Sequence, residues 1–401
     1  MSASQVQGTC DPRFEEVKRE FEKNFAEREE VGASVCLSVN GETLVDLWGG
    51  VADPETGDPW REDTISIVFS CSKAATALCA HILIDRGELD PNALVAEYWP
   101  EFAKNGKEKT TVQMMLNHES ALPALRAPVK QGGFADWDYM IQRMEDEEPF
   151  WEVGTRNGYH MINFGWTVGE LVRRVSGKSL GAFFRDEVAG PTGARFWLGL
   201  PETEDVHIAP IRMYRPKPDD EPTEFTIKMV SDPESIQHKS FMNTGDWDWN
   251  DRKGQTAEIG GAGGLSNARG QVAMYTPLAT NDGTLVSADR LANMTMVSTA
   301  TQRDATLLVP TRFASGFMKS MDNRGLPGGE HMSAIIGDKA FGHVGAGGSI
   351  GFADPECGLA FSYTMNQMGP GILVNDRGQS LIDAAYRSLG YRTNAPGAWV
   401  R

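Results

Sequence analysis

The sequence predicts an α/β fold with an additional α-helical lobe, in which helices flank an antiparallel sheet and a helical domain is inserted between its strands. Strand patterns gather near both ends of the 401-residue chain, whereas the middle shows helical spacing. The apolar fraction of 40% supplies enough side chains for a large core. With 43 glycines and 21 prolines in no repeating pattern, the composition excludes collagen, coiled coils and bulk disorder.

The first expected elements are a helix and a β-hairpin. Asp11-Pro12 is a helix start signal, and the helix that follows has one apolar face, formed by Phe14, Val17, Phe21 and Phe25. Two strand-like runs, 33–39 and 42–48, are separated by Asn40-Gly41. That dipeptide is the strongest short hairpin signal, because both residues readily take the positive φ of a two-residue turn.

The last expected elements are a second hairpin and a helix. Apolar residues alternate with small or polar ones from Leu359 to Met365, which predicts a strand with one apolar face. The turn-forming run 354–358 precedes this strand and makes the segment a hairpin. Apolar residues from Leu381 to Leu389 then follow helical spacing until Gly390 ends the helix. Both termini are therefore expected to contribute strands to one sheet.

The middle of the chain is expected to be mainly helical. One helical pattern ends at Gly177, and a second, which begins at Leu180, ends at Gly190-Pro191. Residues 201–254 form a long stretch that is rich in proline, aspartate and glutamate and has no clear pattern. Irregular segments of this length are usually functional or disordered, and its aromatic residues favour a pocket wall.

These patterns divide the chain into two expected parts. Residues 1–90 and 275–401 form the α/β domain, whose antiparallel sheet draws strands from both termini. Residues 91–274 form the inserted, mainly helical lobe, which includes the long substrate-lining loop.

Charge and cysteine content narrow the choice of function. The formal net charge of −17 repels phosphate backbones and anionic lipids, so nucleic-acid and membrane roles are disfavoured, and solubility is its simplest explanation. The longest near-apolar run, 74–84, is too short to span a membrane. The first residues show no secretory signal, and the five cysteines are scattered without a CxxC pair. We therefore expect a cytoplasmic protein with reduced thiols, as a monomer or a homo-oligomer.

The sharpest chemical signal is a serine and a lysine three residues apart. Ser70 and Lys73 form an S-x-x-K pair, a pattern that arises about once by chance in a protein of this length. A strand-prone run, 65–69, precedes the pair and an alanine-rich helix follows it. Ser70 is thus expected at the first turn of that helix, where free N–H groups and a neighbouring amine can activate its hydroxyl. The alternative is an N-capping serine beside a solvated lysine.

Two further motifs follow in order along the chain. Tyr159 lies in the segment 154–161, between an aromatic loop and a helix, and His343-Val344-Gly345 begins a glycine-rich run before the last hairpin. In order and spacing, the three motifs resemble those of the serine β-lactamase and penicillin-binding-protein superfamily. More narrowly, they are similar to those of the family VIII carboxylesterases, which share the class C β-lactamase fold. The resemblance extends from Gly32 to the last helix and includes the segment 111–118.

The resemblance implies a role for each matching residue. Ser70 matches the nucleophile, Lys73 its partner amine, and Tyr159 the tyrosine that shuttles a proton with the lysine. The backbone N–H groups of Ser70 and Ala346 match the oxyanion hole. Taken alone, Tyr159 fits a half-buried core tyrosine better, and His343 alone fits a loop histidine with satisfied hydrogen bonds, so the assignment depends on their order relative to Ser70.

Four other residues are expected to contact the substrate. His343 and Gly345 occupy the place of the Lys-Thr-Gly strand of the lactamases, and Trp247 and Trp249 are expected near the mouth of the site. An unperturbed histidine is mostly neutral at pH 7, so this site lacks the permanent cation that holds the carboxylate of a β-lactam. His160-Met161 also stands where the lactamases have x-Asn after the motif tyrosine.

We therefore expect a serine carboxylesterase that hydrolyses short-chain neutral esters, as small-molecule substrates, through an acyl-enzyme. The alternatives within the superfamily are a β-lactamase, a D-amino-acid peptidase and an acyltransferase. From a different class, the chain could be a binding or scaffold protein with an inactive site. The complete set of Ser70, Lys73 and Tyr159 argues against that alternative.

Other kinds of chemistry have little support in the sequence. Ser349 lies in a G-x-S-x-G motif, but it leads into a strand pattern and no histidine follows it, so the triad of an α/β-hydrolase cannot form. The seven histidines show no metal-binding spacing. The glycine run 260–264 lacks the βαβ context of a dinucleotide site. We expect neither a metal nor a cofactor.

Overall fold

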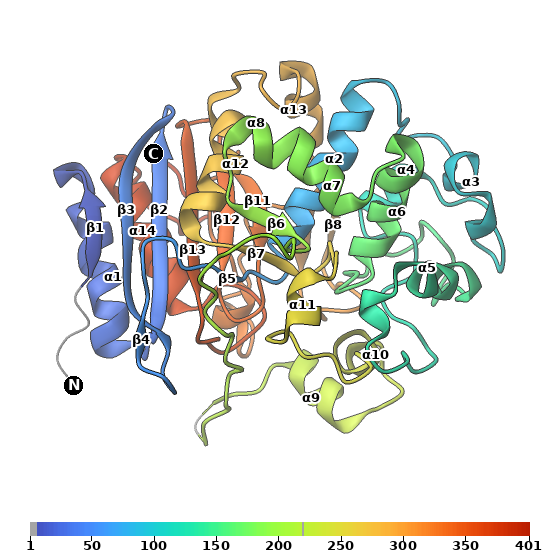
Figure 1. The fold of residues 1–401 in the computed structure, drawn as a ribbon, viewed down its shortest axis with the longest axis horizontal. Coiled ribbons are helices and arrows are strands. Elements are labelled where there is room, and N and C mark those ends of the chain that lie inside the picture. Colours follow the sequence, from blue (N-terminus) through green and yellow to red (C-terminus); the bar gives the residue numbers. More distant parts are fainter. Residues whose placement is uncertain (1–5, 219) are drawn as a thin grey trace.

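The computed structural model describes residues 6–218 and 220–401, so residues 1–5 of the expected α/β domain lie outside it. Its centre is a 10-stranded sheet in the order β1-β3-β2-β13-β12-β11-β10-β9-β8, with β4 paired to β3 (Figure 1). Neighbouring strands run antiparallel, which confirms the predicted fold class. The strands are β1 (Gln7–Cys10), β2 (Gly32–Val39), β3 (Glu42–Asp53), β4 (Asp58–Pro59), β8 (Val297–Thr301), β9 (Thr311–Ala314), β10 (Phe317–Met318), β11 (Phe341–Val344), β12 (Ile350–Asp354) and β13 (Leu359–Met365).

Both termini supply strands to this sheet, as predicted. The turn between β2 and β3 is Asn40-Gly41, with φ values of 52° and 85°, as a two-residue hairpin turn requires. Along nearly its whole length β2 also pairs with β13, from Ala33 opposite Met365 to Val39 opposite Leu359. This pairing joins the N-terminal hairpin directly to the C-terminal one.

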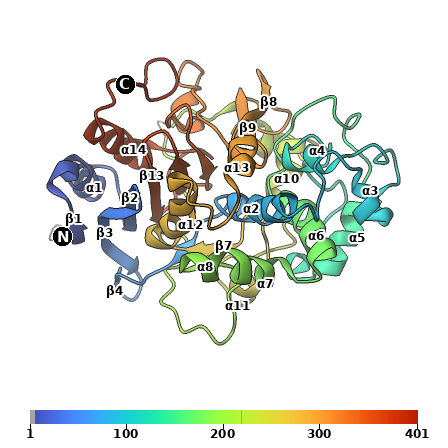
Figure 2. The same ribbon diagram turned by 90° about the horizontal axis from the view of Figure 1, so that it is seen from above.

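Helices cover both faces of the sheet (Figure 2). Helices α1 (Glu15–Glu27) and α14 (Asp376–Ser388) pack together on one face. Helix α12 (Ala268–Thr280) packs on β2, β12 and β13 from the other face. Helix α2 (Ser72–Asp85) contacts β11 as well as α6 and α7, so it lies between the sheet and the helical region. This position explains why nearly all of its residues are buried.

The helical region lies mostly between α2 and α12 in the chain. A second, three-stranded sheet in the order β5-β7-β6 adjoins it, formed by β5 (Ser66–Ile67), β6 (Phe196–Leu198) and β7 (Gly264–Ser266). In the described ranges, no helix is both long and apolar enough to cross a membrane. The remaining helices are α3 (Val95–Tyr98), α4 (Val112–Leu116), α5 (Trp137–Asp146), α6 (Phe164–Ser176), α7 (Leu180–Phe184), α8 (Gly190–Thr192), α9 (Glu224–Ser231), α10 (Ile236–Met242), α11 (Arg252–Thr256) and α13 (Ala288–Met294).

Three local predictions differ from the structure. The expected strand 65–69 is reduced to β5, because Phe69 takes a φ of 44° that ends extended backbone. The helix expected to stop at Gly190-Pro191 continues through a π-turn and α8, and it ends only where Gly193 takes a φ of 67°. The segment 201–254 is not irregular throughout, since it contains α9, α10 and α11.

One of the expected domain boundaries falls inside a helix of the structure. A boundary between residues 274 and 275 cuts through α12, although this whole helix packs on the sheet. We propose instead that the inserted region ends before Ala268, at the start of α12.

A buried ion pair ties the two ends of the chain together beneath the sheet. Arg377, in the first turn of α14, contacts Glu30 at 2.8 Å, and the two side chains are 5% and 0% exposed. Tyr363 on β13 donates a hydrogen bond to the same carboxylate. Since Glu30 directly precedes the hairpin β2–β3, this cluster fixes N-terminal and C-terminal elements to each other.

Glu30→Ala is expected to lower the free energy of unfolding by about 3–5 kcal/mol, because it leaves the Arg377 guanidinium buried without a counter-charge. Urea denaturation followed by circular dichroism measures this change. Glu27→Ala is the matched control: it removes an exposed carboxylate at the end of α1 and should change stability by no more than about 0.5 kcal/mol. Equal effects of the two substitutions would contradict a structural role for the pair.

Candidate active site

Ser70 lies in the turn between β5 and α2, immediately ahead of the helix. Ser72 Oγ holds this turn, since it donates to the carbonyl oxygen of Phe69 at 2.5 Å and accepts from the amide of Gly264 at 2.8 Å. The Phe69 ring packs edge-on against Trp249, with 5.6 Å between the ring centroids. The positive φ of Phe69 is unfavourable for a bulky residue, and these contacts stabilise it. Ser70 is therefore held in one place beside the first turn of α2.

The Lys73 amine is completely buried and contacts three uncharged oxygen atoms. Its Nζ lies 2.9 Å from Ser70 Oγ, 2.5 Å from the carbonyl oxygen of Met161 and 2.7 Å from that of Gly261. A carbonyl oxygen only accepts, so each carbonyl takes one N–H, and the lone pair of a neutral amine then faces Ser70 Oγ. Burial lowers the pKa of Lys73 well below its usual 10.5, because the ammonium loses its hydration. Lys73 can therefore accept the proton of Ser70.

Tyr159 contacts both members of this pair. Its hydroxyl forms a hydrogen bond with the Ser70 side chain, and the Lys73 Nζ lies 4.7 Å from its ring centroid. Burial raises the pKa of the Tyr159 phenol, so the phenol stays protonated at neutral pH. In that state it can pass a proton between neighbouring oxygen atoms without first being ionised.

Asp304 positions the backbone of Tyr159. Its buried carboxylate accepts hydrogen bonds from the Tyr159 amide at 3.0 and 3.1 Å. It also accepts from the amides of Thr306 and Leu307, at 2.8 and 2.9 Å. Sequence reasoning missed this residue, because no spacing rule links a tyrosine to a carboxylate 145 positions away.

The glycine run 260–264 brings a carbonyl oxygen to Lys73. A β-carbon at Gly261 would overlap the carbonyl oxygen of Ile162, and one at Gly165 would overlap the amide of Gly261. The carbonyl oxygen of Gly260 accepts a hydrogen bond from Thr76 on α2 at 2.9 Å. The run therefore allows the backbone to pack closely against α2 and α6, and its glycine density was a visible signal of that contact.

Two residues of the cavity that Ser70 faces have backbone N–H groups that are not used within the described backbone. In the described part of the chain, neither the Ser70 amide nor the Ala346 amide donates to another backbone group. Both residues line the same cavity. Gly345 allows this approach, since a β-carbon there would overlap the carbonyl oxygen of Val68. The two amides are thus available as donors to a developing oxyanion.

Ser70 faces a small apolar cavity of about 90 Å³. None of the described residues that line it is charged. Of the two expected tryptophans, Trp249 lines the cavity, whereas Trp247 packs behind it at 6.3 Å and against Phe134 at 5.6 Å between ring centroids. Met213 and Phe241, from the segment expected to form a pocket wall, also line the cavity. Sequence reasoning did not assign the rest of the apolar lining, which includes Met161, Ile162, Leu307, Met368, Ile372 and Leu373.

His343 lies behind Tyr159 and not at the cavity surface. It is 1% exposed, and its ring centroid lies 5.9 Å from that of Tyr159. Its Nδ1 donates to the carbonyl oxygen of Val344 at 2.8 Å. Burial lowers the pKa of His343 to about 3, so the ring stays neutral at every ordinary pH. Gly345 likewise does not line the cavity, and the structure thus places neither residue at the cavity surface.

His160 and His118 form a second buried layer around Tyr159. His160 Nδ1 lies 2.7 Å from the carbonyl oxygen of Gly158, and its Nε2 accepts from the Leu122 amide at 3.2 Å. The His160 amide donates to Nδ1 of His118 at 3.1 Å, and the His118 ring centroid lies 4.9 Å from that of Tyr159. Burial lowers the pKa of both imidazoles, so both are neutral supports of the tyrosine loop.

Ser349 is buried and does not line the cavity that Ser70 faces. It is 0% exposed, and its carbonyl oxygen accepts from the Gly345 amide at 2.7 Å at the entry to β12. Its hydroxyl has no hydrogen-bond partner within the described residues. Across residues 6–218 and 220–401, no three histidine, cysteine or acidic side chains come together as metal ligands.

Known proteins resemble this chain over most of its length. A profile of the Beta-lactamase family matches residues 17–385. The chain is 32% identical to the protein named esterase/beta-lactamase LipL of Mycobacterium tuberculosis, and the match covers 92% of this chain and 85% of LipL.

Two solved structures share the whole fold. The crystal structure of a family VIII carboxylesterase is 37% identical with a TM-score of 0.84, and the match covers 96% of this chain and 100% of that one. The crystal structure of a penicillin-binding protein homolog from Caulobacter crescentus is 31% identical, also with a TM-score of 0.84, and the coverage is 96% and 100%.

Ser70→Ala is expected to abolish ester hydrolysis, because it removes the only hydroxyl in contact with the Lys73 amine among the described residues. Ser349→Ala is the matched control and should retain most of the activity, since its hydroxyl is buried and unpartnered. Turnover of p-nitrophenyl butyrate and labelling by a fluorophosphonate probe measure the two effects. An active Ser70→Ala variant beside an inactive Ser349→Ala variant would reverse the assignment.

Lys73→Ala and Tyr159→Phe are each expected to lower kcat by at least ~10², the usual effect of losing a general base. The double variant should lose far less than the product of the two effects, because both residues serve one proton path. Tyr98→Phe, which removes an exposed hydroxyl, is the control and should keep full activity. Steady-state kinetics give kcat for each variant. Full activity in Tyr159→Phe would exclude the tyrosine from the proton path.

Proposed function

The chain belongs to the beta-lactamase family and is a serine hydrolase, and we propose that it is a carboxylesterase that cleaves short-chain neutral esters through an acyl-enzyme. One observation carries the proposal: a neutral amine faces a serine hydroxyl at the wall of a small cavity without charged lining. The esterase names of the similar proteins support the same reaction class.

Acylation begins with the Ser70 hydroxyl. As Oγ attacks the ester carbonyl, its proton moves to Lys73, which becomes an ammonium with three oxygen acceptors already in place. The amides of Ser70 and Ala346 donate to the carbonyl oxygen as it becomes negative. When the tetrahedral intermediate collapses, the proton returns to the leaving alcohol through the Tyr159 hydroxyl, which contacts the Ser70 side chain.

Deacylation repeats the same path with water as the nucleophile. Lys73, neutral again, takes a proton from the attacking water through Tyr159, and the proton then returns to Ser70 Oγ as the acid leaves. No further group is required, because the serine hydroxyl, the amine and the phenol are restored at the end of the cycle. Tyr159 passes protons without being ionised in the resting enzyme, since burial raises its pKa.

The cavity supports a short and neutral acyl group. Its volume of about 90 Å³ is far below the ~300–1,000 Å³ of pockets that enclose drug-sized ligands. An uncharged lining offers no counter-ion, and a carboxylate left unpaired in such a place would be costly. His343 cannot supply the missing charge, because burial lowers its pKa to about 3.

A β-lactamase is the second candidate function. The name of LipL includes both activities, and a penicillin-binding protein homolog has the same fold at 31% identity. The lactam ring presents the same kind of carbonyl to Ser70, but its carboxylate meets no cation in the cavity lining. We therefore place this activity below ester hydrolysis.

For the wild-type enzyme, kcat/KM on p-nitrophenyl acetate or butyrate is expected to exceed that on a chromogenic cephalosporin by at least ~10². The physical reason is the carboxylate of the cephalosporin: it is attached next to the lactam nitrogen, so it stays close to the reacting carbonyl in the uncharged cavity, and its burial there without a partner costs roughly 1–3 kcal/mol or more. Initial rates of the same preparation give both constants, and Ser70→Ala corrects for spontaneous hydrolysis. A cephalosporin hydrolysed as efficiently as the better ester would favour the β-lactamase.

A further inference from the structure

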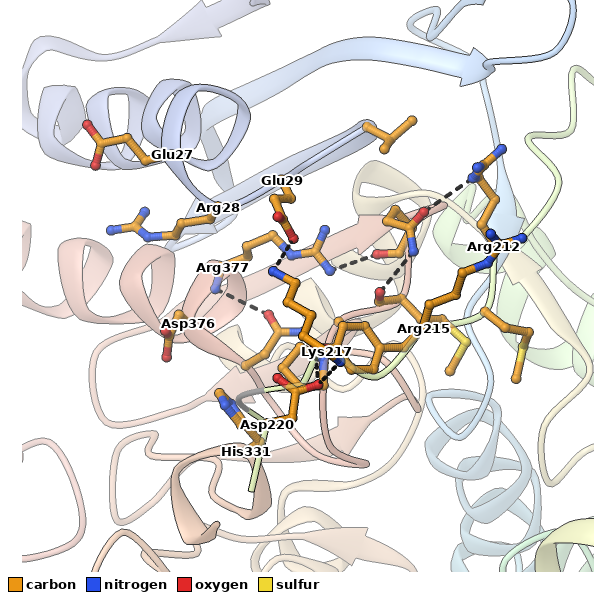
Figure 3. Close-up of a pocket in the computed structure, with 18 of the residues that line it drawn as sticks. Glu27, Arg28, Glu29, Arg212, Arg215, Lys217, Asp220, His331, Asp376 and Arg377 are labelled. Atoms are coloured by element: carbon orange, nitrogen blue, oxygen red, sulfur yellow. Dashed lines mark hydrogen bonds and ion pairs between the residues drawn. The ribbon is translucent and has the colours of Figure 1, made fainter. Parts of the chain in front are cut away.

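A second, larger cleft adjoins the catalytic cavity (Figure 3). It has a volume of about 820 Å³ and lies between the α1–β2 junction, residues 212–217 with Asp220, and the segment 367–377. Met213 and Met368 line both this cleft and the catalytic cavity, so the two spaces meet at these side chains. A substrate bound at Ser70 that outgrows the small cavity therefore extends into the cleft.

Three of the cations that line the cleft are paired with carboxylates. Three cations contact carboxylates at 2.6–2.8 Å, namely Lys217 with Glu29, Arg28 with Glu20 and Arg377 with Glu30. The carboxylate of Asp220 accepts from the Tyr214 hydroxyl and from the Lys217 amide, both at 2.7 Å. The three ion pairs contribute little net charge to a ligand in the cleft, whereas Asp220 keeps its negative charge, because both of its donors are uncharged.

Arg212 and Arg215 are different. Within the described residues, neither guanidinium forms an ion pair, although the chain carries more acids than bases. Arg212 Nε donates to Gln367 Oε1 at 3.2 Å, which orients the side chain and leaves its two terminal nitrogens available. The Arg212 backbone is held as well, by hydrogen bonds of 2.7 Å to Asn366 and 2.9 Å from Met368. Arg212 is thus held in place, next to Met213 in the chain, by contacts of both its side chain and its backbone.

The two arginines and two of the carboxylates lie at different ends of the cleft. In Figure 3, Arg212 and Arg215 reach toward one end, whereas Glu27 and Asp376 lie at the opposite side. Glu55 also lines the cleft, but it pairs with neither arginine in the part of the chain that the structure describes. Two guanidinium groups without an ion pair among the described residues therefore flank Met213 in the chain, where the cleft joins the catalytic cavity.

We propose that Arg212 and Arg215 bind a carboxylate at the far end of an ester substrate. The inference rests on the proposed esterase function and extends its substrate class to esters that carry a carboxylate several bonds from the reacting carbonyl. A guanidinium offers two parallel N–H groups that match the two oxygens of a carboxylate. The apolar stem of such an ester would lie along Met213 and Met368. Short neutral esters fill only the small cavity and do not use this contact.

Paired esters that differ only in a distal charge test the proposal. One pair varies the acyl group, with mono-4-nitrophenyl adipate against 4-nitrophenyl hexanoate, and the other varies the alcohol, with 4-acetoxybenzoate against its methyl ester. Arg212→Gln and Arg215→Gln are each expected to lower kcat/KM about tenfold on the charged member of at least one pair. The neutral members should change less than twofold. Arg195→Gln removes an exposed charge outside the cleft and should change no substrate.

A binding measurement separates this inference from the esterase proposal. In the Ser70→Ala background, calorimetry gives the Kd of each intact ester without turnover, and adding Arg212→Gln should weaken only the charged esters, by about tenfold. Unchanged Kd values, or equal losses on charged and neutral esters, would overturn the inference. If the wild type cleaves no ester but the arginine-dependent binding remains, the carboxylate site stands and the esterase proposal fails.

Discussion

The burial of the Lys73 amine is the constraint on which the rest of the site depends. Removing an ammonium from water costs several kcal/mol, and its neighbours here are two carbonyl oxygens and a hydroxyl, none of them charged. This set of oxygens lets the amine exist both neutral, with two donated hydrogen bonds, and charged, with three. A carboxylate in the same place would have held it as a cation, which cannot accept a proton from Ser70.

The three oxygens around the Lys73 amine come from separate parts of the fold. Ser70 comes from the turn after β5, the Met161 carbonyl follows the tyrosine motif, and the Gly261 carbonyl comes from the glycine run before β7. Helix α2 carries Lys73 between the sheet and the helical region. The amine is therefore properly surrounded only when both regions are packed against α2, so the proton-accepting site and the tertiary fold form together.

Much of this arrangement could be predicted from the sequence, and the missing parts have physical causes. The hairpin at Asn40-Gly41 and the order of Ser70, Lys73 and Tyr159 rest on side-chain identity and spacing, which a sequence displays directly. The carbonyl oxygens of Met161 and Gly261 and the carboxylate of Asp304 act through tertiary contacts that no local pattern encodes.

Two other features of the structure differ from the sequence prediction, although the sequence carried some signal for each. The helices α9, α10 and α11 begin at side-chain caps, Thr223, Ser235 and Asp251, that the proline-rich and acidic composition of the segment concealed. His343 matched a substrate-binding position by resemblance, but its side chain packs behind Tyr159, and that depth is set by how the central strand β11 meets the tyrosine loop.

The distribution of charge around Ser70 affects how charged and neutral esters approach and bind. The net charge of −17 opposes the approach of anions from a distance, whereas screening confines each surface charge to about 8–10 Å at physiological salt. In the proposed binding mode, a distal carboxylate gains from Arg212 and Arg215 only after the ester has entered the cleft. Charged and neutral esters then differ mainly in how slowly they leave, because short-range contacts act on dissociation more than on encounter. In this proposed mode the reacting carbonyl lies in the uncharged cavity in both cases, so the surroundings of Lys73 stay the same while the far end of the substrate decides affinity.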